Sequence, residues 1–200
     1  MPLIGNSGPM QDIRALVERI APMAATVLIE GESGTGRTLL ARLLHEQSGR
    51  RGPFIPVDCN AVAGGVPDTA KQAGATLFLA NVDALPMDLQ GKMLRNMEQS
   101  VNADNRIVAS TKANVAELVA RQRFRDDLYH RLSILNIQLP ALSARGDDVF
   151  LLLNTFMESY ADTVSPFILD DDARALWGQY DYPGNVRELR NIVIRLGTKY

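Results

Sequence analysis

Short apolar runs recur along the first two thirds of the chain, each bounded by glycine, proline or polar residues. Five runs have the length of a strand and predict strands over residues 26–29, 54–57, 75–79, 107–110 and 134–139. Helical spacing of apolar residues fills the segments around them, at residues 7–20, 38–47, 87–99 and 113–129. This alternation predicts an α/β fold, a parallel five-stranded sheet with helices on both faces.

The pattern changes after Pro140, where no further strand-like run occurs. Residues 147–161, 169–179 and 185–196 have helical spacing instead. We therefore expect two domains, an α/β core over residues 1–140 and a small helical domain over residues 141–200.

Composition excludes several classes of function. The 200 residues are 46% hydrophobic with a net charge of −2, so they bury a core but offer no bulk positive field for nucleic acid. Cys59 is the only cysteine and His45 and His130 the only histidines, so we expect no disulfide within the chain and no metal site. No apolar run reaches the length of a membrane span, and a cytoplasmic protein with no membrane partner is expected.

A glycine-rich segment between the first strand and the next helix carries the strongest chemical signal. It reads Gly31, Glu32, Ser33, Gly34, Thr35, Gly36, Arg37, Thr38. A loop of this spacing cradles phosphates with its backbone N–H groups and the N-terminus of the helix that follows. Arg37 stands where that motif has lysine, and its longer planar fork is not equivalent to a compact ammonium group. A glycine-rich turn without a ligand is the alternative.

Four motifs together give a specific resemblance. They are residues 31–36 (GESGTG), residues 76–79 (TLFL), residues 123–132 (RFRDDLYHRL) and residues 182–191 (YPGNVRELRN). With them the chain resembles the AAA+ central domain of sigma-54-dependent transcriptional activators, the bacterial enhancer-binding proteins. The resemblance implies a P-loop ATPase with a helical lid, assembly into a dimer or ring, and a DNA-binding domain beyond Tyr200.

The largest chemical departure from the family lies at the end of the third strand. The family has Asp-Glu there, to hold magnesium and to polarise the attacking water, whereas this chain has Ala80 and Asn81. A methyl group offers a metal nothing, and a neutral amide cannot accept a proton from water. The resemblance therefore implies at most weak binding of ATP or ADP and argues against magnesium. Asp83, which the family shares, is expected to serve a turn.

Two further positions differ in charge from the family. Lys112 follows the fourth strand, where the family usually has an asparagine that senses the terminal phosphate, and a solvated lysine is the alternative there. Asp58 stands in place of an asparagine that holds the catalytic glutamate inactive. The pair Asp58 and Asn81 thus resembles the family pair with carboxylate and amide exchanged, which leaves Asp58 as a candidate base.

The segment that would contact sigma-54 is short in this chain. Sixteen residues separate Cys59 from Thr76, where the family has a much longer stretch with a G-A-F-T-G-A loop. Gly64 and Gly65, followed by Pro67, are expected to form the turn that closes the gap.

Motifs for acting on a neighbouring subunit are retained. Arg125 and Arg131 match the family's arginine fingers, and Arg187 matches the sensor arginine of the lid. Ordinary pairing is the alternative for each, Arg125 with Asp126 or Asp127 and Arg187 with Glu188 or a core carbonyl.

Several functions fit these residues. The first is a regulatory AAA+ domain without hydrolysis or sigma-54 contact, working as an oligomerising or anion-sensing platform, with DNA reached through a domain outside this chain and RNA polymerase with the ordinary sigma factor as a partner. The others are an atypical active ATPase that uses Asp58 and Arg37, a module for another phosphate ligand such as a cyclic dinucleotide, and a subunit that lends Arg125 and Arg131 to an intact relative.

Overall fold

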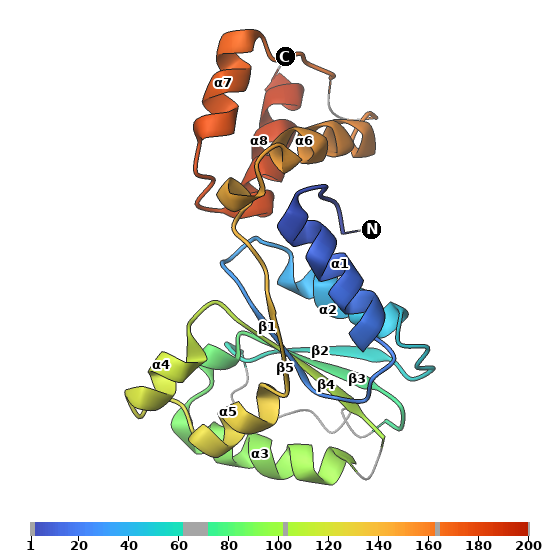
Figure 1. The fold of residues 1–200 in the computed structure, drawn as a ribbon, viewed down its shortest axis with the longest axis vertical. Coiled ribbons are helices and arrows are strands. Elements are labelled where there is room, and N and C mark those ends of the chain that lie inside the picture. Colours follow the sequence, from blue (N-terminus) through green and yellow to red (C-terminus); the bar gives the residue numbers. More distant parts are fainter. Residues whose placement is uncertain (1–2, 62–71, 102–103, 163–164, 200) are drawn as a thin grey trace. The chain divides into compact units, whose positions relative to one another are not determined.

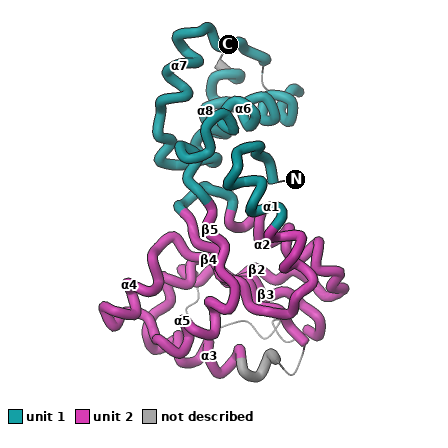
Figure 2. The backbone as a smooth tube through the Cα atoms, in the orientation of Figure 1, with its two compact units in different colours: residues 1–15, 32–36, 140–200 teal, residues 16–31, 37–139 magenta. Residues whose placement is uncertain are grey.

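A computed structural model describes residues 3–61, 72–101, 104–162 and 165–199 of the chain. It contains two compact units (Figure 2). The sheet unit comprises residues 16–31 and 37–139, and the helical unit comprises residues 1–15, 32–36 and 140–200. The expected turn at Gly64, Gly65 and Pro67 lies outside the described residues. Within the described ranges, no helix is both long enough and apolar enough to cross a bilayer.

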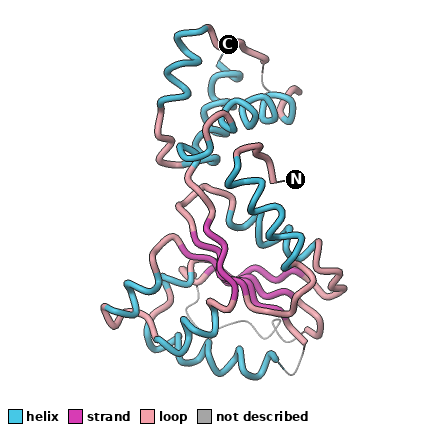
Figure 3. Tube along the Cα trace, in the orientation of Figure 1, coloured by secondary structure: helices cyan, strands magenta, loops and turns pink. Residues whose placement is uncertain are grey.

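The sheet has five strands, all parallel, in the order β2-β3-β4-β1-β5 (Figure 3). Each observed strand lies within one residue of the predicted one at both ends, so the predicted parallel sheet is confirmed. Because the strands are parallel, their carboxyl ends share one edge of the sheet. The strands are β1 (Val27–Glu30), β2 (Phe54–Asp58), β3 (Thr76–Ala80), β4 (Arg106–Thr111) and β5 (Leu135–Gln138).

Helices cover both faces of the sheet, as the alternating pattern predicts (Figure 1). On one face, Leu77 and Leu79 of β3 pack in one buried cluster with Met93 and Leu128 from the covering helices. The opposite face is covered by the helix that follows β1. The helices are α2 (Arg37–Glu46) on that opposite face and α3 (Met87–Val101), α4 (Val115–Ala120) and α5 (Asp126–Leu132) on the first, with a short 3-10 helix, η2 (Val82–Ala84), after β3.

The single helix predicted over residues 113–129 is wrong, because the chain breaks it into α4 and α5. Gln122 adopts a left-handed conformation with φ 55°, and the N–H groups of Arg123 and Phe124 both donate to Leu118 O. This turn buries Phe124, which is 2% exposed and belongs to the core cluster. Burial of one aromatic ring therefore outweighs the helical propensity of the charged residues around it.

A buried arginine joins the sheet to the helix α1 (Gly8–Ile20), whose last residues belong to the sheet unit. Arg106 of β4 is fully buried, and it donates to Ala21 O at 2.7 Å and to Ile20 O at 3.1 Å. Burial lowers its pKa to about 10. The guanidinium thus satisfies carbonyl groups that the end of α1 leaves without helical partners.

The helical unit contains η3 (Leu142–Arg145), α6 (Asp148–Ser159), α7 (Asp171–Gln179) and α8 (Asn185–Lys199). The three predicted helices after Pro140 are thereby confirmed. Their apolar faces form one core, to which Leu152, Phe156 and Leu189 contribute. Residues 1–15 and 32–36 group with this unit. The division into domains at residue 140 stays a prediction.

Candidate phosphate-binding site

The backbone of the glycine-rich loop explains two of its glycines. Gly34 and Gly36 have positive φ angles of 85° and 109°, which side chains other than glycine rarely adopt. A Cβ on Gly34 would also lie 2.1 Å from Gly184 O, a backbone atom that cannot swing away. Between these glycines, Thr35 is buried and its hydroxyl donates to Glu32 O at 2.8 Å. The loop requires glycine at these positions whether or not a ligand binds.

Residues 32–36 of the loop are held by the helical unit to which they belong. Asn185 is fully buried, and its amide group donates to Glu32 Oε2 at 3.0 Å and to Ser33 O at 3.1 Å. The Asn185 Oδ1 atom accepts from Leu142 N at 2.7 Å. Arg145, 2% exposed, donates to Thr35 O at 2.9 Å. The start of α8 and the end of η3 thus fix the loop backbone.

Asn185 and Arg145 are positioning residues that sequence reasoning missed. Asn185 lies inside a motif quoted for the resemblance, but its sequence context gives no hint that its side chain bonds three partners. Its positive φ of 52° is an indirect sign, because asparagine tolerates that conformation better than most residues. Arg145 carries no sequence signal, because burial of an arginine follows only from the fold.

The side chain of Arg187 contacts the glycine-rich loop and does not pair with its sequence neighbour Glu188. Its guanidinium donates to Ser33 Oγ at 3.2 Å. Glu188 is engaged elsewhere, accepting from Tyr180 OH at 2.9 Å and from Gly184 N at 2.7 Å. The glutamate raises the pKa of the Tyr180 hydroxyl through this hydrogen bond. The alternative pairing of Arg187 with Glu188 is therefore not the one that the structure contains.

In the sheet unit, the ends of β2 and β3 bring together the two residues of the exchanged pair. Asp58 is in register with Ala80, and Asn81 follows directly. The Asn81 amide group donates to Asp58 Oδ1 at 3.1 Å. The same oxygen accepts from the backbone and the side chain of Asn60, and these bonds hold the pKa of Asp58 below its ordinary value.

Arg37, the first residue of α2, reaches the same strand end. Its guanidinium donates to Asn81 Oδ1 at 3.3 Å. Asn81 has φ 58° and precedes η2, a position where an asparagine side chain often caps the helix, but here it makes no capping bond. Its amide group instead accepts a hydrogen bond from Arg37 and donates one to Asp58.

Lys112 and Asp83 lie near the end of β4 with different environments. Lys112 is exposed and follows Thr111, the last residue of β4. Asp83 accepts a hydrogen bond from Thr111 Oγ1 at 3.0 Å, which ties η2 to the end of β4. This contact supports the expected turn role of Asp83.

The two candidate arginine fingers differ in their contacts. Arg125 precedes α5 and forms a bidentate pair with Asp127, its Nε and Nη2 atoms donating at 3.0 Å and 2.7 Å. This hydrogen bond lowers the pKa of Asp127 and raises that of Arg125. The ordinary pairing considered for Arg125 is therefore present. Arg131 is exposed and has no ion pair with the part of the chain that the structure describes.

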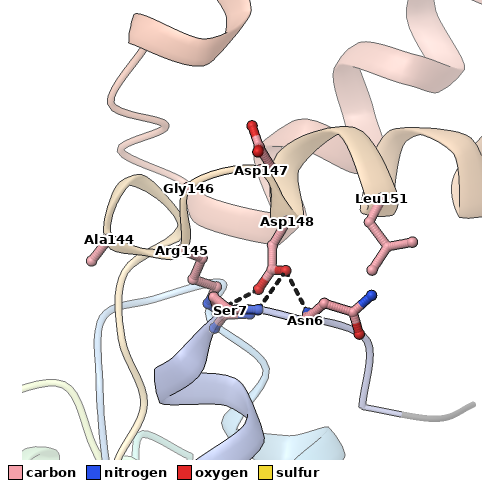
Figure 4. Close-up of a pocket in the computed structure, with 8 residues that line it drawn as sticks. All are labelled: Asn6, Ser7, Ala144, Arg145, Gly146, Asp147, Asp148 and Leu151. Atoms are coloured by element: carbon pink, nitrogen blue, oxygen red, sulfur yellow. Dashed lines mark hydrogen bonds between the residues drawn. The ribbon is translucent and has the colours of Figure 1, made fainter.

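A pocket of about 580 Å³ opens within the helical unit beside the start of α1 (Figure 4). Asp148, one of its lining residues, is 3% exposed and accepts from Asn6 N, Ser7 N and Ser7 Oγ at 2.5, 3.0 and 2.6 Å. Both carboxylate oxygens are thus already used to hold the N-terminus of α1. The lining residues are Asn6, Ser7, Ala144, Arg145, Gly146, Asp147, Asp148 and Leu151.

Two family models match the chain and together span nearly all of it. A "Sigma-54 interaction domain" matches residues 4–142, and an "AAA+ ATPase lid domain" matches residues 143–198. The chain belongs to the sigma-54 interaction domain family. The resemblance to sigma-54 activators drawn from the four motifs is confirmed at this level, as are the P-loop fold and its helical lid.

Curated relatives of this sigma-54 interaction domain are bacterial transcriptional regulators. The response regulator protein PilR of Pseudomonas aeruginosa is 36% identical over 230 residues, which cover 98% of this chain and 52% of PilR. The DNA-binding transcriptional regulator NtrC of Rhizobium meliloti is 33% identical over 233 residues, covering 100% of this chain and 48% of NtrC. The chain spans about half the length of these relatives.

Solved structures agree with the fold. NtrX from Brucella abortus in complex with ADP superposes with a TM-score of 0.89 at 34% identity, covering 98% of this chain and 51% of NtrX. The same protein in complex with ATP gives a TM-score of 0.87 at 33% identity, with coverage of 98% and 52%.

Proposed function

We propose that this sigma-54 interaction domain belongs to a bacterial transcriptional regulator and binds a nucleotide or another phosphate anion without hydrolysing it. The observation that carries the proposal is the end of β3, where Ala80 and Asn81 provide no carboxylate. Without one, the end of β3 has neither an anionic oxygen ligand for magnesium nor a proton acceptor for water. The NtrX complexes with ATP and ADP support these nucleotides as ligands of the domain.

The domain would then support assembly and ligand sensing, and it would not use ATP hydrolysis to drive a conformational change. In this proposal it associates with further copies into a dimer or ring, and Arg125 and Arg131 reach the nucleotide of a neighbour. DNA would be bound by a domain outside this chain, and RNA polymerase with the ordinary sigma factor would be the target. The relatives' names as transcriptional regulators support this setting.

Anion binding without a divalent metal is the first expected result. Arg37 and Lys112 supply positive charge where two family carboxylates are missing, so calorimetric affinity for ATP should change less than about twofold between magnesium and EDTA. Arg37→Ala and Lys112→Ala should each weaken binding about tenfold or more, the usual scale of charge-assisted hydrogen bonds. Lys92→Ala, which removes an exposed lysine of α3, is the control.

The same titrations should include inorganic phosphate and a cyclic dinucleotide. Heat with the cyclic dinucleotide alone would assign the site to that ligand class. No heat with any of the three, and no change in melting temperature, would show that the loop is an unoccupied relic and would overturn the anion-sensing proposal.

Sigma-54 itself is expected not to bind. The matched segments of PilR and NtrC are longer than the 200 residues of this chain, which supports the inferred deletion between Cys59 and Thr76. A loop of sixteen residues that starts and ends in the sheet can project from it by at most about half of its extended length. That length is about 3.3–3.6 Å per residue. Size-exclusion chromatography with sigma-54 and a transition-state analogue should give separate peaks, and co-elution would contradict the prediction.

One observation favours a second candidate, an atypical ATPase. Asp58 is an exposed carboxylate in register with Ala80, on the strand next to β3. It is ionised at neutral pH, as a general base must be, and its lowered pKa makes it a weak base. Hydrolysis assays on the Asp58→Asn variant distinguish this candidate from the first.

A further inference from the structure

Arg37, Asn81 and Asp58 form a continuous hydrogen-bonded chain in the sheet unit. The guanidinium of Arg37 donates to Asn81 Oδ1, and the amide nitrogen of Asn81 donates to Asp58 Oδ1. The three side chains come from the start of α2 and from the ends of β3 and β2. A cation and an anion are thus joined through one neutral amide.

The amide of Asn81 has only one orientation that satisfies both neighbours. Arg37 has only donors and the Asp58 carboxylate only acceptors, so the Asn81 oxygen must face the guanidinium and its nitrogen the carboxylate. Asp58 polarises the amide in the sense that makes its oxygen a better acceptor for Arg37. Two bonds from Asn60 in turn fix Asp58.

We propose that Asp58 and Asn81 are positioning residues that hold the Arg37 guanidinium at the end of β3, so that an anion bound at the start of α2 must displace it from Asn81. This inference rests on the proposed anion binding and adds what sets its affinity. An anion that takes the N–H group which Arg37 Nη2 donates to Asn81 replaces that hydrogen bond. The hydrogen bonds among Arg37, Asn81 and Asp58 therefore lower the affinity of the protein for an anion, and their disruption raises that affinity.

The test measures the affinity of the whole chain for ATP and for inorganic phosphate in EDTA. Asn81→Ala and Asp58→Ala should each increase affinity about three- to tenfold, since a charge-assisted hydrogen bond to Arg37 no longer competes. In the Arg37→Ala background the same substitutions should have no effect. Asp88→Ala, which removes one exposed carboxylate of α3 and so the same charge as Asp58→Ala, is the control.

Unchanged or weaker binding in Asn81→Ala would overturn the proposal, and so would an equal gain in the Arg37→Ala background. If the variants bind an anion and the unmodified protein does not, the proposed restraint of Arg37 by Asn81 and Asp58 is supported in its strongest form. If neither the unmodified protein nor a variant binds either anion, the proposed anion binding fails. The hydrogen bonds among Arg37, Asn81 and Asp58 are then tested by thermal unfolding, monitored by circular dichroism. Arg37→Ala and Asn81→Ala should then shift the melting temperature non-additively, whereas additive shifts would refute the coupling.

Discussion

Magnesium-dependent ATP hydrolysis by this chain is expected at background rate. Loss of a general base alone costs about 10²–10⁴-fold in rate, and the missing metal ligand at Ala80 adds to this. The Asn81 amide cannot substitute, because its oxygen accepts from Arg37 and its nitrogen donates to Asp58. The measurement is phosphate release at saturating ATP and high protein concentration, with the corresponding domain of Rhizobium meliloti NtrC assayed in parallel.

Restoring one carboxylate should not restore turnover. In Asn81→Glu the new carboxylate would face the Arg37 guanidinium and pair with it, while Ala80 would still offer no metal ligand. The combination Ala80→Asp, Asn81→Glu and Arg37→Lys is the variant in which activity is expected to reappear. Turnover in the unmodified chain that requires magnesium and disappears in Asp58→Asn would instead establish the atypical ATPase.

The sheet could be predicted from sequence because each strand is an apolar run with clear ends. Strands β1, β3 and β4 are buried almost throughout, which is the environment that produces such runs in parallel sheets. The predicted helix over residues 113–129 failed for a related reason. In the sequence, Phe124 looks like one more apolar position of that helix. Nothing in the sequence indicates that burial of its ring requires a turn between two shorter helices.

The site was predictable where a local motif determines the backbone and unpredictable where distant residues meet. The loop from Gly31 to Thr38 has a spacing that defines its conformation, and Gly34 and Gly36 adopt the positive φ angles expected of such a turn. The contact between Asn81 and Asp58 joins residues 23 positions apart, and Arg145 and Thr35 are 110 positions apart. Such contacts depend on strand register and helix placement, which single-residue chemistry does not encode.

The stability of the helical unit is expected to depend on one buried carboxylate. Asp148→Ala leaves two backbone N–H groups, of Asn6 and Ser7, and the Ser7 hydroxyl without their acceptor. These donors are only partly buried, so water replaces part of the lost contacts, and the free energy of unfolding should fall by about 1–3 kcal/mol. The substitution also removes the negative charge that favours the buried Arg145 cation, whose pKa burial lowers and Asp148 raises.

A single fluorophore makes this loss measurable in the unit where it occurs. Trp177 is the only tryptophan of the chain and packs against the core of the helical unit, so its fluorescence in a urea titration reports on that unit. Asp148→Asn keeps one acceptor oxygen and should lose less stability than Asp148→Ala. The neighbouring Asp147→Asn, at an exposed carboxylate without a capping bond, should change stability by less than about 0.5 kcal/mol. Equal midpoints for Asp148→Ala and Asp147→Asn would mean that the start of α1 is held by its apolar contacts, and that the three hydrogen bonds to Asp148 contribute nothing beyond what water supplies in the unfolded chain.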